Sequence, residues 1–204
     1  LAAILVVPRY LRWRGSAYTD YSYHPIFTKG AGTDAIGQIP ELIGAGFPSF
    51  KVFTTSIRPP SPQMFDNHTD FGRLDAIMEP IAQHGGLLLV HSEDDEMVHY
   101  NYSLAEERGL LDWWNMHLIH TNLSEDVSFR RVIRLAERKG TGIYFVHVSA
   151  GEGVDAIAEA RSKGLPVYGE TLHNYACFCA DNYREPDGMK YHTYPSLKSE
   201  ADAR

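Results

Sequence analysis

The feature that most constrains this chain is a repeated alternation between short apolar runs and segments of helical periodicity. The apolar runs are as long as strands and predict strands at 18–28, 49–55, 87–91, 143–148 and 165–170. Helical spacing or a terminating glycine predicts helices between them, at 36–44, 71–84, 124–140 and 154–164. Strands and helices that alternate in this way are typical of a parallel sheet.

Two segments are less regular. Pro80 lies inside the second helical segment, 71–84, and predicts a kink or an early end there. The polar and aromatic stretch between His91 and Leu123 reads as a longer helical region, with a new helix starting at Ser124.

About five strand–helix units fit this pattern, so the fold class we expect is α/β, a partial TIM (β/α)₈ barrel. No Gly-x-Gly-x-x-Gly follows an apolar run, which disfavours a dinucleotide-binding sheet. The chain starts at Leu1 rather than Met and stops at Arg204 in a polar run. We therefore expect residues 1–204 to be a single incomplete barrel domain that lacks the first and last barrel strands.

Charge and composition narrow the possible partners. The net charge is −7 and no basic patch stands out, so nucleic acid is a disfavoured partner. The apolar run 1–7 is far shorter than the ~20 residues that cross a bilayer, so no membrane association is expected. Cys177 and Cys179 are too close in sequence for an ordinary disulfide, and we read them as reduced cysteines of a cytoplasmic protein.

Three polar residues interrupt or close the apolar runs: Lys51, His91 and His147. Residues near the carboxyl ends of barrel strands face the active site, so these three side chains are expected to meet. Neutral imidazole is a ligand for zinc and related ions. Each residue also has a simpler interpretation, because a lone strand-end histidine is commonly a hydrogen-bonded core residue and a strand lysine commonly reaches solvent.

Several motifs in order resemble the dihydropyrimidinase and hydantoinase group of cyclic amidohydrolases. They are Ser49-Phe50-Lys51-Val52-Phe53, Val90-His91-Ser92-Glu93, Val146-His147-Val148-Ser149, Gly169-Glu170-Thr171, and the segments 183–188 and 195–198. The resemblance runs from about Tyr18 to the end of the chain.

The resemblance implies a TIM barrel with two divalent metal ions, usually zinc. It implies that Lys51 is carboxylated by CO₂ and bridges the ions, and that His91 and His147 bind one of them. The metals would lower the pKa of a water molecule and polarise the carbonyl of a small cyclic amide, such as a hydantoin or a dihydropyrimidine. Glu93 and Glu170 are candidate partners of the ligand histidines. The family's general-base aspartate is expected beyond residue 204, and a homo-oligomer is expected.

The chain departs from the family pattern in ways that affect metal and substrate binding. It has no His-x-His; His117 and His120 are three apart and in the wrong place for it. A substrate-contacting tyrosine five positions after the lysine is replaced by Ser56, and Tyr194 is our candidate for the lost hydroxyl. The alternative function is a non-catalytic, dihydropyrimidinase-like scaffold or binding protein, and residues 1–204 alone are expected to be inactive.

Overall fold

The computed structural model describes residues 15–56 and 68–203. The apolar run 1–7 and the prolines at 59–62 lie outside the described residues. Within the described part of the chain, no helix is long and apolar enough to cross a membrane.

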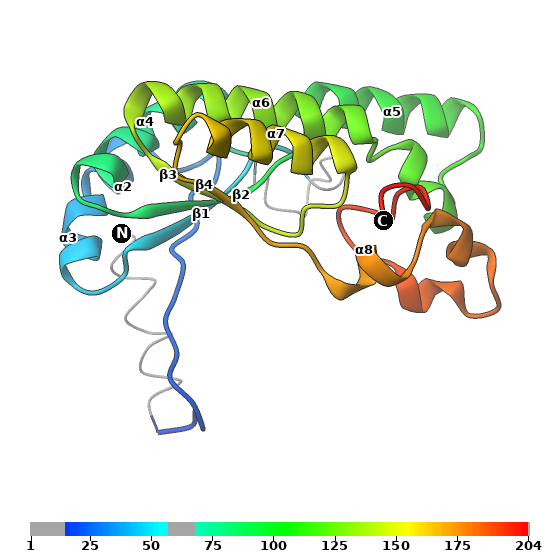
Figure 1. The fold of residues 1–204 in the computed structure, drawn as a ribbon, viewed down its shortest axis with the longest axis horizontal. Coiled ribbons are helices and arrows are strands. Elements are labelled where there is room, and N and C mark those ends of the chain that lie inside the picture. Colours follow the sequence, from blue (N-terminus) through cyan, green and yellow to red (C-terminus); the bar gives the residue numbers. More distant parts are fainter. Residues whose placement is uncertain (1–14, 57–67, 204) are drawn as a thin grey trace.

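A parallel sheet of four strands forms the centre of the fold (Figure 1). The strands are β1 (Ser49–Phe53), β2 (Leu87–His91), β3 (Gly142–Phe145) and β4 (Val167–Gly169), and each pairs in parallel with the next one along the chain. Consecutive parallel strands with a helix in each connection are the arrangement found in a barrel wall. The predicted α/β class with a parallel sheet is confirmed.

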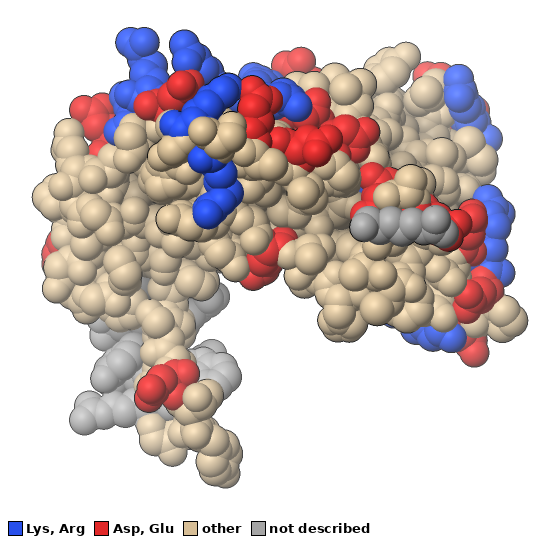
Figure 2. Space-filling view, viewed as in Figure 1, with Lys and Arg blue, Asp and Glu red and all other residues tan. Residues whose placement is uncertain are grey.

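Helices occupy the connections between the strands. They are α2 (Thr33–Gly37), α3 (Ile39–Gly44), α4 (Phe71–Gln83), α5 (Asp95–Glu107), α6 (Asn122–Lys139), α7 (Gly151–Ser162) and α8 (His173–Cys177), with the 3₁₀ segments η1 (Trp113–Leu118), η2 (Ala180–Arg184) and η3 (Gly188–Tyr191). Figure 1 shows α4, α6 and α7 lying over one face of the sheet. Figure 2 shows charged side chains gathered on the outer side of this helical layer.

Local sequence accounts for the helix boundaries. The Asp70 carboxylate accepts a hydrogen bond from the Arg73 amide at the start of α4, and the Thr121 hydroxyl accepts one from the Ser124 amide at the start of α6. Helix α6 ends at Gly140, whose positive φ of 71° suits a residue without a Cβ atom.

The core lies between the sheet and the helical layer. The strand side chains that face the helices are fully buried: Phe50, Val52, Leu88, Val90, Ile143 and Phe145. Alternate positions point to the opposite face, where Lys51, Leu89 and Tyr144 are neighbours in register and are half-buried. Lys51 thus lies on the face opposite the helical layer.

Some predicted boundaries were wrong. Residues 18–28 form no strand, and the segment makes a single β-bridge, between Ile26 and Lys51. The Pro25 carbonyl accepts a hydrogen bond from the Lys51 amide, but proline has no amide hydrogen to donate, so the pairing does not continue. Helix α4 does not end early, since Pro80 forfeits one hydrogen bond while Ile77 and Ile81 stay fully buried. The long helical region after His91 is divided into α5 and η1 by a turn at Gly109, with φ 67°.

Candidate metal centre

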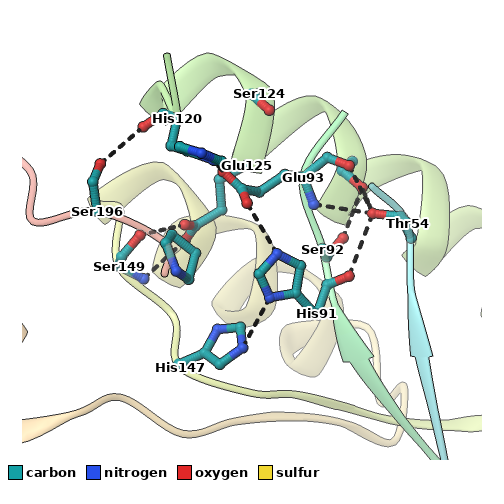
Figure 3. Close-up of polar contacts among 12 residues, drawn as sticks. Thr54, His91, Ser92, Glu93, His120, Ser124, Glu125, His147, Ser149 and Ser196 are labelled. Carbon is teal, nitrogen blue, oxygen red and sulfur yellow. Dashed lines mark hydrogen bonds and ion pairs between the residues drawn. The ribbon is translucent and has the colours of Figure 1, made fainter. Parts of the chain in front are cut away.

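The ends of β2 and β3 bring two histidines together. His91 closes β2, and His147 follows β3 by two residues. The Nδ1 atom of His91 lies 3.0 Å from the Nε2 atom of His147, and the two ring centroids are 4.7 Å apart (Figure 3). The sequence motifs at 91 and 147 therefore meet at the carboxyl end of the sheet.

The backbone at His147 is unusual. Its φ is +45°, a left-handed conformation that is uncommon for residues other than glycine. Such a conformation costs of order 1–3 kcal/mol and persists where the surroundings determine it. Here Val146 donates its amide to the Val90 carbonyl and Val148 donates to the Glu170 carbonyl, so both neighbours are fixed by adjacent strands. The turn ends the strand and aims the imidazole at His91.

Lys51 carries a buried amine on β1. Its Nζ atom has no hydrogen-bond partner among the described residues and lies 4.5 Å from the centroid of the Phe53 ring. Burial lowers the pKa of Lys51 to about 7, while the charge of Glu170 acts in the opposite direction. A substantial fraction of this amine is therefore neutral and nucleophilic near neutral pH.

Burial also keeps the two histidines neutral. It lowers the pKa of His147 to about 3, with further contributions from His91 and Lys51. Burial likewise lowers the pKa of His91, although Glu93 opposes the effect. Neutral imidazole nitrogen is the form that binds a transition metal.

Glu93 holds His91 from the side away from His147. One carboxylate oxygen of Glu93 lies 2.9 Å from His91 Nε2, and the other lies 2.8 Å from His120 Nδ1 (Figure 3). Burial disfavours the ionised form of Glu93, yet His120 and His91 hold the pKa of this carboxyl well below its usual range. Glu170, the other predicted partner, is exposed and accepts a hydrogen bond from the Tyr144 hydroxyl instead.

Hydroxyl groups fix the backbone of Glu93. The Thr54 hydroxyl donates to the Glu93 carbonyl at 2.7 Å and accepts from the Glu93 amide at 3.0 Å. The Ser128 hydroxyl from α6 bonds both Thr54 and Ser92, at 2.9 and 2.8 Å. The loop that carries Glu93 is thereby attached to the end of β1 and to α6.

The donor set fits a metal ion in part. His91 and His147 present facing nitrogen atoms, and the buried Lys51 amine makes no hydrogen bond to any residue that the structure describes. Over residues 15–56 and 68–203, no group of three or more His, Cys, Asp or Glu side chains could hold a metal ion. The described residues therefore place two imidazole nitrogens face to face, and Lys51 as an unmodified amine adds no anionic group to them.

The structure also locates Tyr194, for which the sequence predicts a substrate contact, and His120, for which it predicts no role. Tyr194, our substrate-contact candidate, packs its ring against His120 with centroids 5.2 Å apart. His120 is fully buried and bonded to Glu93, a role that sequence reasoning missed. No sequence signal connects His120 with Glu93, because 27 positions separate them and His120 lies in a loop before α6.

Comparison with known proteins extends these observations. No family model matches the chain. It is 34% identical over 179 residues to a D-hydantoinase of Streptomyces coelicolor, covering 87% of this chain and 37% of that protein. It is 32% identical over 187 residues to a D-hydantoinase of Geobacillus stearothermophilus, covering 90% of this chain and 38% of that protein. A dihydropyrimidinase structure from Brevibacillus agri has a TM-score of 0.85 at 26% identity, covering 97% of this chain and 43% of that one.

The parallel sheet, with polar residues at its carboxyl end, resembles a segment of the barrel type found in a dihydropyrimidinase structure. Within that type the chain is hydantoinase-like, in sequence and in fold, over about nine-tenths of its length. It spans less than two-fifths of the length of these curated relatives.

Proposed function

We propose that the full gene product carrying this chain is a metal-dependent hydrolase of a cyclic amide or imide, such as a hydantoin or a dihydropyrimidine. The likeness to D-hydantoinases and a dihydropyrimidinase supports the substrate class. The chain then supplies the middle strands of one barrel domain, and the family's remaining ligands and its general-base aspartate belong to the rest of the barrel.

The observation that carries the proposal is the buried Lys51 amine, which has no hydrogen-bond partner within 15–56 and 68–203 and lies on the strand next to β2 and its terminal His91. A buried amine of this kind is costly unless it is neutral or paired. In its neutral form, the nitrogen lone pair can form a bond to the carbon of CO₂, and an amine proton leaves to solvent. The product is a carbamate, whose negative oxygens are the kind of ligand that lysine itself cannot provide.

With this modification, Lys51, His91 and His147 would hold divalent metal, which we propose to be zinc. Bound metal supplies Lewis acidity, lowering the pKa of a water molecule and polarising the substrate carbonyl. The chain's own residues would keep both imidazoles neutral and oriented. We propose that Tyr194, which lies against His120, contacts the substrate.

The test compares Lys51→Met with wild type in the full gene product. We expect wild type to bind zinc, to open a hydantoin or a dihydropyrimidine ring, and to show a carbamate ¹³C signal after equilibration with ¹³C-bicarbonate. Lys51→Met should lose all three. Lys163→Met is the matched control, because Lys163 is exposed and pairs with Glu159 on the helical layer.

The outcomes separate the candidate functions. If Lys51→Met opens the ring at the wild-type rate, a carbamate on Lys51 is not needed for the reaction and this part of the proposal is wrong. Zinc binding without hydrolysis of any five- or six-membered cyclic amide would identify a non-catalytic relative of the hydantoinases instead.

A further inference from the structure

Three buried side chains form a continuous row that begins at the proposed metal ligand His91. His91, Glu93 and His120 are each no more than 1% exposed. Glu93 lies between the two imidazoles and uses a different oxygen for each of them (Figure 3). A carboxylate accepts hydrogen bonds and cannot donate them, so both nitrogen atoms that face it must carry hydrogen.

This arrangement fixes the tautomer of His91. With hydrogen on Nε2, the neutral ring has its lone pair on Nδ1, the atom that faces His147. Histidine ligands of metals commonly donate their second nitrogen to a carboxylate, which sets the ring's orientation and raises its basicity. Glu93 can act in this way only if its own position is fixed.

His120 fixes the second oxygen of Glu93, and His120 itself is held from several directions. Its Nε2 atom lies 3.4 Å from the Tyr102 hydroxyl on α5. Its ring packs edge-on against Tyr194, and its carbonyl accepts hydrogen bonds from the Ser196 hydroxyl and the Lys198 ammonium. The segment 194–198 therefore anchors a residue that contacts Glu93.

We infer that His120 is a positioning residue for the proposed metal site, holding Glu93 so that His91 keeps its Nδ1 lone pair available to a metal ion. The inference rests on the proposed function only for the identity of the ligand; the tautomer it predicts is a property of the metal-free protein. Segment 194–198 contributes by fixing His120.

The experiment uses zinc affinity of the full gene product, measured by competition with a chromophoric chelator. His120→Leu keeps most of the side-chain volume and removes the donor to Glu93, so we expect affinity to fall about 10- to 100-fold. His120→Asn keeps an amide donor near the position of Nδ1 and should restore most of the affinity. His117→Asn is the control, since the Nδ1 atom of His117 bonds the Trp114 carbonyl rather than Glu93, and this variant should bind zinc as wild type does.

Two results would overturn the inference: wild-type affinity in His120→Leu, or equal losses in the Leu and Asn variants. The second would mean that ring volume rather than the donor matters. Thermal unfolding of the metal-free variants shows whether a loss of affinity reflects a general loss of folded protein.

A second measurement separates this inference from the proposed function. Nitrogen chemical shifts of His91 in metal-free wild type should report one tautomer with hydrogen on Nε2, and His120→Leu should report a mixture. If this difference is found but no variant binds zinc, the positioning role stands and the metal function fails. If zinc binds normally and the tautomer does not depend on His120, the metal function stands and the positioning role fails.

Discussion

At the scale of single residues, two adjacent threonines show how differently a buried hydroxyl can contribute. Thr54 and Thr55 both have fully buried side chains just after β1. The Thr54 hydroxyl satisfies the amide and the carbonyl of Glu93, whereas the Thr55 hydroxyl has no hydrogen-bond partner in the described part of the chain. Because a buried polar group left unpaired costs about 1–3 kcal/mol, the two residues should respond oppositely to the same substitution.

We therefore expect Thr54→Val to lower the free energy of unfolding by about 1–3 kcal/mol, since it leaves the backbone of Glu93 unsatisfied. It should also weaken zinc binding, because Glu93 orients His91. Thr55→Val should be neutral or stabilising. Urea denaturation of the metal-free proteins measures both changes, and equal effects of the two substitutions would contradict the account.

Single residues also show which members of the candidate site can be identified from the sequence. Lys51 and His91 are visible because each breaks the apolar pattern of a strand, and His147 because it follows one. The roles of Thr54 and His120 could not be predicted, since their partner Glu93 lies 39 and 27 positions away and the contacts are made by loops. Periodicity carries no information on which loop residues meet.

At the scale of elements, α6 and α7 are joined by a buried carboxylate. Glu125, in the first turn of α6, accepts hydrogen bonds from the amides of Ser149 and Ala150 at the start of α7 and from the Ser149 hydroxyl. Burial raises the pKa of Glu125, while Lys198 and these hydrogen bonds act to lower it. Helix α7 packs so closely that a Cβ atom at position 153 would crowd the side chains of Glu125, Phe129 and Val148.

Gly153→Ala tests this packing. A Cβ atom there would lie 2.8 Å from Glu125 Oε1 and 3.1 Å from Phe129 Cε2. We expect a loss of about 1–3 kcal/mol in the free energy of unfolding, as for other overpacked cores. Gly37→Ala in α2 is the control, because nothing lies within 4 Å of the added atom. Urea midpoints at constant m-value measure the difference, and an unchanged midpoint for Gly153→Ala would contradict it.

Element boundaries were harder to predict than element types. The run 143–148 is apolar apart from His147, yet β3 stops at Phe145 because His147 takes a left-handed conformation. That conformation is set by hydrogen bonds to the neighbouring strands and leaves no mark on hydrophobic periodicity. The order of strands and helices, by contrast, follows directly from the alternation of apolar runs and helical spacing.

At the scale of the whole molecule, the candidate site joins strands that are far apart in the sequence. Lys51 lies in the middle of β1, His91 closes β2 and His147 follows β3, and 56 positions separate the two histidines. A metal ion held by these residues would bind the folded sheet and not the unfolded chain. By mass action, a ligand at 100 times its dissociation constant stabilises the folded state by about 2.7 kcal/mol.

Zinc should therefore raise the midpoint of thermal unfolding of the metal-free full gene product, progressively with its free concentration. His147→Ala removes one of the two facing nitrogen ligands and should abolish most of the increase. His84→Ala is the matched control, because His84 is exposed at the end of α4, and it should retain the wild-type response. Calorimetric scans over a zinc titration measure these midpoints. If zinc raises the midpoint of His147→Ala as much as that of wild type, the stabilising ion binds elsewhere on the protein.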